Sequence, residues 1–151
     1  MSRLPVALLT GFLIAAATVL PTASAAASVQ DDAIHKLNQI RQAKGLSMLR
    51  ASESLFRSST RYAQHMIDRD YFGHASRIAA SSAFPRVGET LELHSGWNAD
   101  PARTIDEWMN SPGHRAVLLS RSYRWVGMGV VRGRIGSRSV TVWVAHVGAR
   151  R

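Results

Sequence analysis

Three residues that could do chemistry, His74, Glu89 and His114, each follow a glycine in the sequence. Glycine lets the backbone turn sharply and allows a neighbouring group to approach closely. Neutral imidazoles and a carboxylate are ligands that zinc and similar divalent ions accept. The same groups could instead hold a proton donor and a proton acceptor around a bound water. A structural alternative is that the histidines bond polar neighbours at helix boundaries while Glu89 accepts backbone N–H groups and holds loops together.

The rest of the composition excludes several kinds of catalytic and metal-binding chemistry. The chain has no cysteine, which excludes disulfides, thiolate nucleophiles and zinc–thiolate sites. No Gly-x-Ser-x-Gly elbow occurs in the sequence, so a serine nucleophile of that kind is not expected. We expect His94 and His146 to be incidental, although His146 alternates with Val144 and could face the site. His65 is expected on a solvated or partly packed helix face.

Hydrophobic spacing and cap residues predict the elements that would position these side chains. Helices are expected first and a pair of strands last, an order that favours separate α and β layers over a doubly wound parallel sheet. Trp108, Trp125 and Trp143 are expected in the core, and Trp97 is expected to be exposed. The expected elements are a helix from Asp31 to Gly45, a long helix from Ser52 to about Asp70, a short strand or extended loop at Val87–Leu93, short helices after Asp100 and after Ser111, and two antiparallel strands at Trp125–Val131 and Val140–Val147 around a loop at Arg132–Arg138.

The N-terminal segment has the pattern of a secretory signal peptide. Arg3 precedes an apolar run from Pro5 to Leu20, and Ala23-Ser24-Ala25 fits the small-x-small rule for cleavage. The run is shorter than the roughly 20 residues that a membrane-spanning helix needs. We therefore assign residues 1–25 to a signal peptide, 26–30 to a linker and 31–148 to one domain, and we expect a secreted, extracytoplasmic protein.

The 151 residues are 46% hydrophobic and 19% charged, a balance typical of a folded globular domain. The formal net charge of +9 makes anionic partners plausible, such as cell-envelope polymers or lipid head groups. Arginines that could form such a surface are expected near the chain end. They are Arg132, Arg134 and Arg138 in the loop, with Arg150 and Arg151. Export and the lack of a recognisable binding module argue against nucleic acid, and a monomer is expected.

Six short blocks occur in the order found in the CAP superfamily, which includes cysteine-rich secretory proteins, insect venom antigens and plant pathogenesis-related proteins. The chain resembles the short, cysteine-free bacterial branch known as SCP domains, and the resemblance covers nearly all of residues 31–148. The blocks are Asn38–Arg41 (NQIR), Tyr71–His74 (YFGH), Gly88–Leu91 (GETL), Trp108–Arg115 (WMNSPGHR), Gly127–Gly129 (GMG) and Val142–Val144 (VWV).

The resemblance implies an α+β fold, an α-β-α sandwich with a small antiparallel sheet and a surface cleft. His74, Glu89 and His114 match the two histidines and the first acidic residue of that cleft, and His74 and His114 become the candidate metal ligands. Where many relatives carry a second acidic residue, this chain has Ser111. The stretch between His74 and Glu89 is short, so a helix present in many bacterial relatives is expected to be missing.

Three functions remain open from the sequence. The first is a binding module without catalysis, in which the cleft holds a small lipid-like ligand or a divalent ion such as Zn²⁺. The second is a metal-assisted, protease-like hydrolase with Glu89 as candidate general base. The third is a cell-envelope interaction protein that uses the arginine-rich surface. We favour the first because the sequence offers no evident nucleophile.

Overall fold

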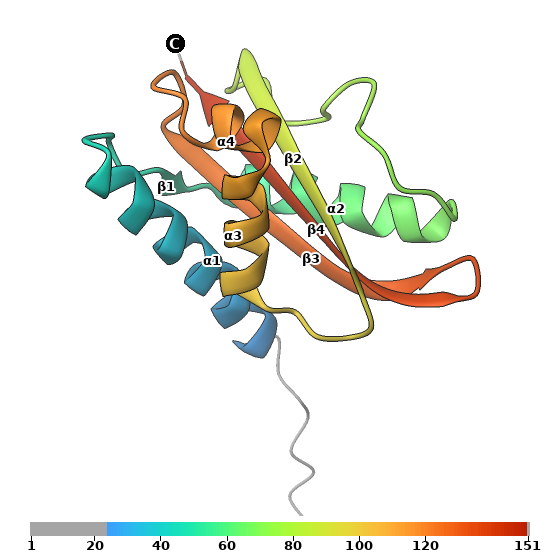
Figure 1. Ribbon diagram of the computed structural model, residues 1–151. Coiled ribbons are helices and arrows are strands. Elements are labelled where there is room, and N and C mark those ends of the chain that lie inside the picture. The colour runs from blue at the N-terminus through green and yellow to red at the C-terminus, as the bar shows by residue number, and fades with distance from the viewer. Residues whose placement is uncertain (1–23, 151) are drawn as a thin grey trace, which may run out of the picture.

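The computed structural model describes the backbone of residues 24–150 and their side chains from Val29 onward (Figure 1). The signal-peptide prediction for residues 1–25 therefore falls almost wholly outside the described part of the chain. The elements are α1 (Ser24–Ala43), β1 (Arg50–Ala51), α2 (Glu53–Asp68), β2 (Arg86–Ser95), α3 (Pro101–Asn110), α4 (Pro112–Leu118), β3 (Trp125–Ile135) and β4 (Arg138–Ala149).

The four strands form one sheet in the order β1-β3-β4-β2. Helix α2 covers one face, while α1, α3 and α4 cover the other, which gives the expected α-β-α sandwich (Figure 1). The long strands β2, β3 and β4 are antiparallel neighbours. The two-residue strand β1 pairs parallel to β3, so the sheet is mixed rather than antiparallel throughout.

Alternation along β4 divides the core into two layers. Val142 and Val144 face α2, whereas Trp143, Ala145 and Val147 face the layer of α1 and α3. Because successive side chains of a strand point to opposite faces, this parity also places His146 on the α2 side. Of the tryptophans, Trp108 and Trp143 are fully buried and Trp97 is 55% exposed, as expected.

Trp125 differs from the expectation of a core tryptophan, because it is only half-buried. The guanidinium of Arg150 lies 4.1 Å from the centroid of its ring, and that of Arg50 lies 5.7 Å away. Trp125 is the first residue of β3 and lies at the solvent-exposed end of that strand. The ring is therefore flanked by two guanidinium groups and by the ring of Phe84, whose centroid lies 6.4 Å away.

Two glycines of β3 let α2 lie directly on the sheet. A Cβ atom at Gly127 would stand 2.0 Å from the backbone nitrogen of Phe56, and one at Gly129 would stand 2.4 Å from that of Thr60. Both distances are far below a van der Waals contact, so no larger residue fits without moving the helix. This close approach fixes α2 relative to β4 and brings Ser58 to His146.

Two boundaries differ from the sequence expectation. Residues 26–30, expected as a linker, lie within α1, which begins at Ser24. The expected loop at Arg132–Arg138 is mostly strand, because β3 and β4 continue to a two-residue turn at Gly136 and Ser137. Gly136 has a φ of 58°, the left-handed conformation that such tight hairpin turns require and glycine adopts readily.

The arginines expected in one basic surface are separated by the length of β4. Arg134 lies beside the hairpin turn and Arg150 follows the opposite end of the strand, about 36 Å away at 3.3 Å per residue. Arg132 donates to the carbonyl of Trp97 at 2.6 Å. The hairpin and the chain end therefore do not form one continuous patch. None of the helices in the described part of the chain is long and apolar enough to cross a membrane.

Candidate functional site

Glu89 is the centre of a hydrogen-bonded assembly at the edge strand β2. Its side chain is 4% exposed. Oε1 accepts from Nδ1 of His74 at 2.9 Å and from the backbone N–H of Ala75 at 3.0 Å. Oε2 accepts from Nε2 of His146 at 3.0 Å. Glu89 and His146 are direct cross-strand partners of β2 and β4, so the sheet register itself creates this pair.

These contacts keep the carboxylate of Glu89 charged. Burial alone would raise its pKa, but the hydrogen bonds from His146, from the Ala75 N–H and from His74 outweigh it and lower the pKa. An ionised carboxylate can only accept hydrogen bonds, so the facing nitrogens of both histidines carry protons. Glu89 thus ties the loop after α2 to the centre of the sheet, the structural role that the sequence left open.

Ser58 on α2 completes the assembly from the other side. Its hydroxyl lies 2.7 Å from Nδ1 of His146 and 3.0 Å from the carbonyl of Leu55. The hydroxyl donates to the Leu55 carbonyl, and its oxygen lies within hydrogen-bond distance of Nδ1 of His146, whose Nε2 holds a proton toward Glu89. The chain Ser58–His146–Glu89–His74 therefore runs from α2 across the sheet to the loop. His146, expected to be incidental, is a buried member of it.

His74 and His114 face each other above this assembly. Their ring centroids are 6.4 Å apart and the ring planes are inclined by 55°. The side chain of His74 is 60% exposed. Burial lowers the pKa of His114, the nearby His74 lowers it further and Glu92 partly opposes both, so the ring is neutral near pH 7. The structure thus brings His74, Glu89 and His114 together at one edge of the sheet.

Ser111 lies between α3 and α4, where it is the C-cap residue of α3 and the N-cap residue of α4. Its side chain makes no capping hydrogen bond to α4. The described structure has no helix between α2 and β2, as the short stretch from His74 to Glu89 predicted. The acidic charge that acts on His114 comes from Glu92 on β2 instead of from the Ser111 position.

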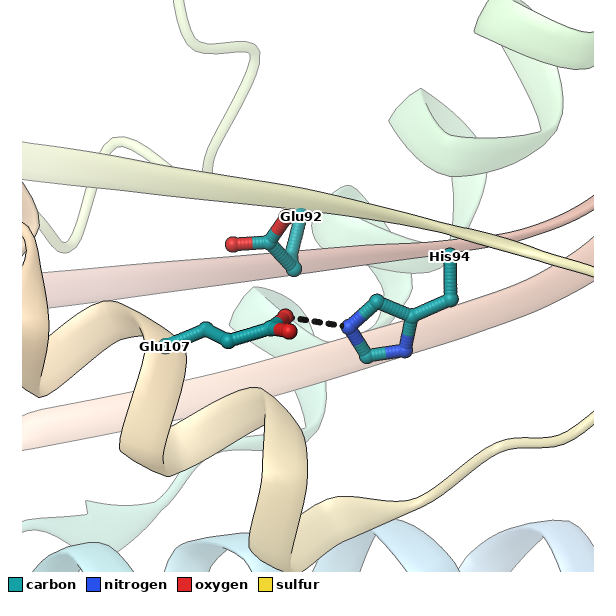
Figure 2. Close-up of side chains that lie close together, drawn as sticks. All are labelled: Glu92, His94 and Glu107. Atoms are coloured by element: carbon teal, nitrogen blue, oxygen red, sulfur yellow. Dashed lines mark hydrogen bonds and ion pairs between the residues drawn. The ribbon is translucent and has the colours of Figure 1, made fainter.

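A second histidine–carboxylate group lies on the opposite face of β2. Ligand atoms of Glu92, His94 and Glu107 all lie within 4.8 Å of one another. Nε2 of His94 is 2.6 Å from Oε2 of Glu107. Figure 2 shows Glu92 and His94 extending from β2 toward Glu107 on α3. His94, expected to be incidental, is a buried member of this group.

The strand patterns around His146 and His94 give a weak indication that both side chains have polar partners. His146 follows Val142 and Val144 on one face of β4, and a histidine in a buried apolar series needs a polar partner. His94 lies on the same face of β2 as Thr90 and Glu92, a polar series in which a buried histidine also needs a partner. Neither pattern names the partner, because Ser58, Glu89 and Glu107 arrive from other elements.

A hollow of about 210 Å³ lies beside the Glu89 assembly, between α2 and the loop at residues 75–79. Ser58 and His146 contribute to one wall, Ile78 to another, and Arg61 and Arg77 also line it. This hollow combines an apolar wall with two cationic side chains, so it could accept a small ligand with an anionic end.

Comparison with known proteins places this chain in a family. The model of CAP, the cysteine-rich secretory protein family, matches residues 34–147. The uncharacterized Bacillus subtilis protein YkwD is 27% identical over 123 residues, which cover 76% of this chain and 47% of YkwD. The uncharacterized B. subtilis membrane protein YlbC is 28% identical over 104 residues, 63% of this chain and 29% of YlbC. The chain thus spans less than half the length of either relative.

Solved structures show the same fold. An extracellular SCP-domain protein from Bacillus anthracis superposes with a TM-score of 0.67 at 18% identity, covering 88% of this chain and 45% of that one. An outer surface protein of Borrelia burgdorferi gives a TM-score of 0.62 at 19% identity, covering 80% of this chain and 92% of that one. At such identities the similarity establishes the architecture and leaves the chemistry to this chain's own residues.

Proposed function

The chain belongs to the CAP family of cysteine-rich secretory proteins, and within it we propose that this domain binds a divalent transition-metal ion between His74 and His114 without catalysing a reaction. The observation that carries this proposal is the hydrogen bond from Nδ1 of His74 to the buried carboxylate of Glu89 at 2.9 Å. A metal-binding histidine typically donates its second ring N–H to a carboxylate in this manner, which fixes the tautomer and orients the ring.

The protonation states suit a metal ligand on both rings. Because Nδ1 of His74 holds its proton toward Glu89, the nitrogen left for a metal ion is Nε2, on a side chain that is 60% exposed. His114 is held neutral by its lowered pKa and therefore also offers a lone pair. Two neutral imidazoles suit Zn²⁺, Cu²⁺ or Ni²⁺ better than Mg²⁺ or Ca²⁺. Solvent would complete the coordination.

The spacing of the two rings requires only a small adjustment. With a Zn–N distance of 2.0–2.1 Å and tetrahedral angles, the centroids of two ligating imidazoles lie about 5 Å apart. The observed separation is 6.4 Å. A rotation of the exposed His74 side chain that moves its ring by about 1.5 Å would close the difference.

The hydrolase alternative is less well supported by the same geometry. A general base must reach the proton that it removes. Both oxygens of Glu89 are engaged by protein donors, and the side chain is nearly inaccessible. Glu89 therefore acts on the cleft through His74, as a positioning residue.

Zinc titration calorimetry of the chelator-stripped domain tests the proposal. We expect one ion to bind at the cleft of the wild-type protein and that binding to disappear in the His74→Ala/His114→Ala variant. His35→Ala is the matched control, because His35 is an exposed histidine on α1 whose ring forms a hydrogen bond with Gln39. Loss of zinc in the control, or unchanged binding in the double variant, would rule the cleft out. Circular dichroism establishes that all variants are folded.

A lipid-like ligand is the second candidate, and the hollow beside α2 favours it. Its apolar wall at Ile78 and its cations Arg61 and Arg77 suit a short acyl chain with a carboxylate. The volume of about 210 Å³ is below the usual range for drug-sized ligands, which argues for a short chain. Titration with octanoate tests this, with Arg77→Gln expected to weaken binding. Equal affinity in wild type and variant would exclude the hollow as the binding place.

Export is proposed from the sequence pattern of residues 1–25. Two structural neighbours, from B. anthracis and B. burgdorferi, are themselves described as extracellular or outer surface proteins, which supports the same location. Expression of the full chain in a bacterial host, followed by N-terminal sequencing of the exported product, should give a mature chain that starts at about Ala26. Retention of Met1 in the cytoplasm would contradict it.

A further inference from the structure

Glu92, His94 and Glu107 form a second polar group that the proposed cleft does not use. Glu92 and His94 project from β2 on the face that packs against α3, opposite to Glu89. Glu107 reaches them from the middle of α3 (Figure 2). The three residues thus come from a rigid strand and a rigid helix rather than from a loop.

The imidazole of His94 is buried and directed at the carboxylates. Its side chain is 2% exposed, and its Nε2 contacts Oε2 of Glu107 at 2.6 Å. Nδ1 of the same ring is buried without a partner among the described residues. The only polar contact of this buried ring therefore points into the group formed with Glu92 and Glu107.

The two carboxylates differ in how far the protein compensates their charge, and Glu92 is the one left without an ionic partner among the described residues. Oε1 of Glu107 accepts from Nε of Arg103 at 2.9 Å. Glu92 accepts only from the backbone N–H of Leu93, at 3.2 Å, and makes no ion pair with any described residue. In a chain of net charge +9, two acidic side chains converge here, and Arg103 pairs with Glu107 rather than with Glu92. Two carboxylates held close together repel unless a cation compensates them.

We propose that Glu92, His94 and Glu107 bind a divalent cation at a site separate from the His74/His114 cleft. The ligands would be one imidazole nitrogen and two carboxylate oxygens. This set is richer in oxygen than a pair of histidines, so it accepts Mn²⁺ as well as Zn²⁺. The two sites share no ligand, although the charge of Glu92 also acts on His114, and the inference does not require that the cleft bind a metal ion.

The present geometry is close to that of a bound ion. In a tetrahedral site with bonds of about 2.1 Å, neighbouring ligand atoms lie about 3.4 Å apart. The ligand atoms of this group already lie within 4.8 Å of one another. Rotation of the partly exposed Glu92 side chain supplies the remaining movement. Binding through Nε2 of His94 moves the proton of the neutral ring to Nδ1, the nitrogen that has no partner among the described residues.

Titration of Mn²⁺, followed by the electron paramagnetic resonance signal of the free ion, tests the site on the whole folded domain. The decisive variant is Glu92→Gln, because Glu92 makes only one weak local hydrogen bond and its loss should not disturb folding. Glu107→Gln removes a second candidate ligand and is an independent test of the site. Glu53→Gln is the charge-matched control, since Glu53 is an exposed acid on α2. His74→Ala/His114→Ala separates this site from the cleft.

We expect one Mn²⁺ per wild-type chain, with unchanged affinity in Glu53→Gln and in His74→Ala/His114→Ala. The affinity should fall about tenfold or more in Glu92→Gln and in Glu107→Gln. Absence of Mn²⁺ binding by the wild-type domain, or equal affinity in Glu92→Gln, would overturn the inference. Loss of Mn²⁺ in His74→Ala/His114→Ala, with retention in Glu92→Gln, would assign the ion to the cleft and overturn it as well.

Discussion

Replacing Glu89 by glutamine is expected to destabilise the domain while preserving the size and shape of the side chain. Glutamine can keep its oxygen at the Oε1 position, where it accepts from His74 and Ala75. Its amide NH₂ group then faces the N–H of His146, so the bond at 3.0 Å is lost unless that ring changes tautomer. The substitution therefore removes one buried hydrogen bond and the charge assistance of two others.

The loss of folding free energy expected for Glu89→Gln follows from these three hydrogen bonds. A hydrogen bond to a charged group contributes about 1.5–3 kcal/mol and a neutral one about 0.5–1.5. Loss of the His146 bond together with weakening of the other two would cost about 3–4 kcal/mol. Burying a neutral amide in place of a carboxylate recovers part of this, which leaves about 2–3 kcal/mol. For a domain of this size the melting temperature should fall by about 10 °C.

Urea denaturation as a function of pH provides the assay. The pKa of Glu89 is lowered from its ordinary value of 4.5, so its stabilising contribution is complete above about pH 5 and is lost as the pH falls below 4.5. The difference between wild type and Glu89→Gln should shrink over the same range. Glu53→Gln, on the exposed face of α2, should change stability by less than about 0.5 kcal/mol. A Glu89→Gln variant as stable as that control at pH 7 would refute the reasoning.

Three further outcomes are expected. Gly127→Ala should destabilise by about 3 kcal/mol or more in urea denaturation, because a Cβ there would stand 2.0 Å from the α2 backbone, whereas Gly113→Ala meets nothing within 4 Å and should be neutral. Asp100→Ala should cost about 1 kcal/mol, since its carboxylate caps α3 through the N–H of Arg103 at 3.0 Å; an unchanged melting temperature would contradict this. Because the pKa of His114 is lowered, protons compete less with zinc for its ring between pH 7 and 6. The zinc affinity measured by calorimetry should therefore fall less steeply over this range than the affinity of a free histidine pair. An equal dependence of affinity on pH would count against a neutral His114 ring.

Local patterns in the sequence predicted most of the secondary structure. The Asp100-Pro101 pair marks the start of α3, and the spacing of apolar residues marks α2. The extent of β2 was underestimated, because its ten residues are held as a strand by pairing with β4 rather than by their own alternation. The parallel contact of β1 with β3 spans only two residues and leaves no local signal.

The candidate site was predictable only in part, for a physical reason. The family blocks placed His74, Glu89 and His114 together, and the structure brings them to one edge of β2. They did not indicate that both oxygens of Glu89 are engaged by protein donors. That arrangement depends on the β2–β4 register, which brings His146 opposite Glu89, and sheet register is set by the packing of the whole domain.

The central claim is that His74 binds a metal ion through Nε2 while Nδ1 keeps its proton on Glu89. Two-bond ¹H–¹⁵N spectra of the domain labelled with [¹⁵N]histidine, recorded with and without one equivalent of Zn²⁺, observe both nitrogens directly. We predict that the Nε2 resonance of His74 shifts to the range of metal-bound imidazole, with Nδ1 remaining protonated. An Nε2 resonance unchanged at saturating zinc, or coordination through Nδ1, would contradict the account.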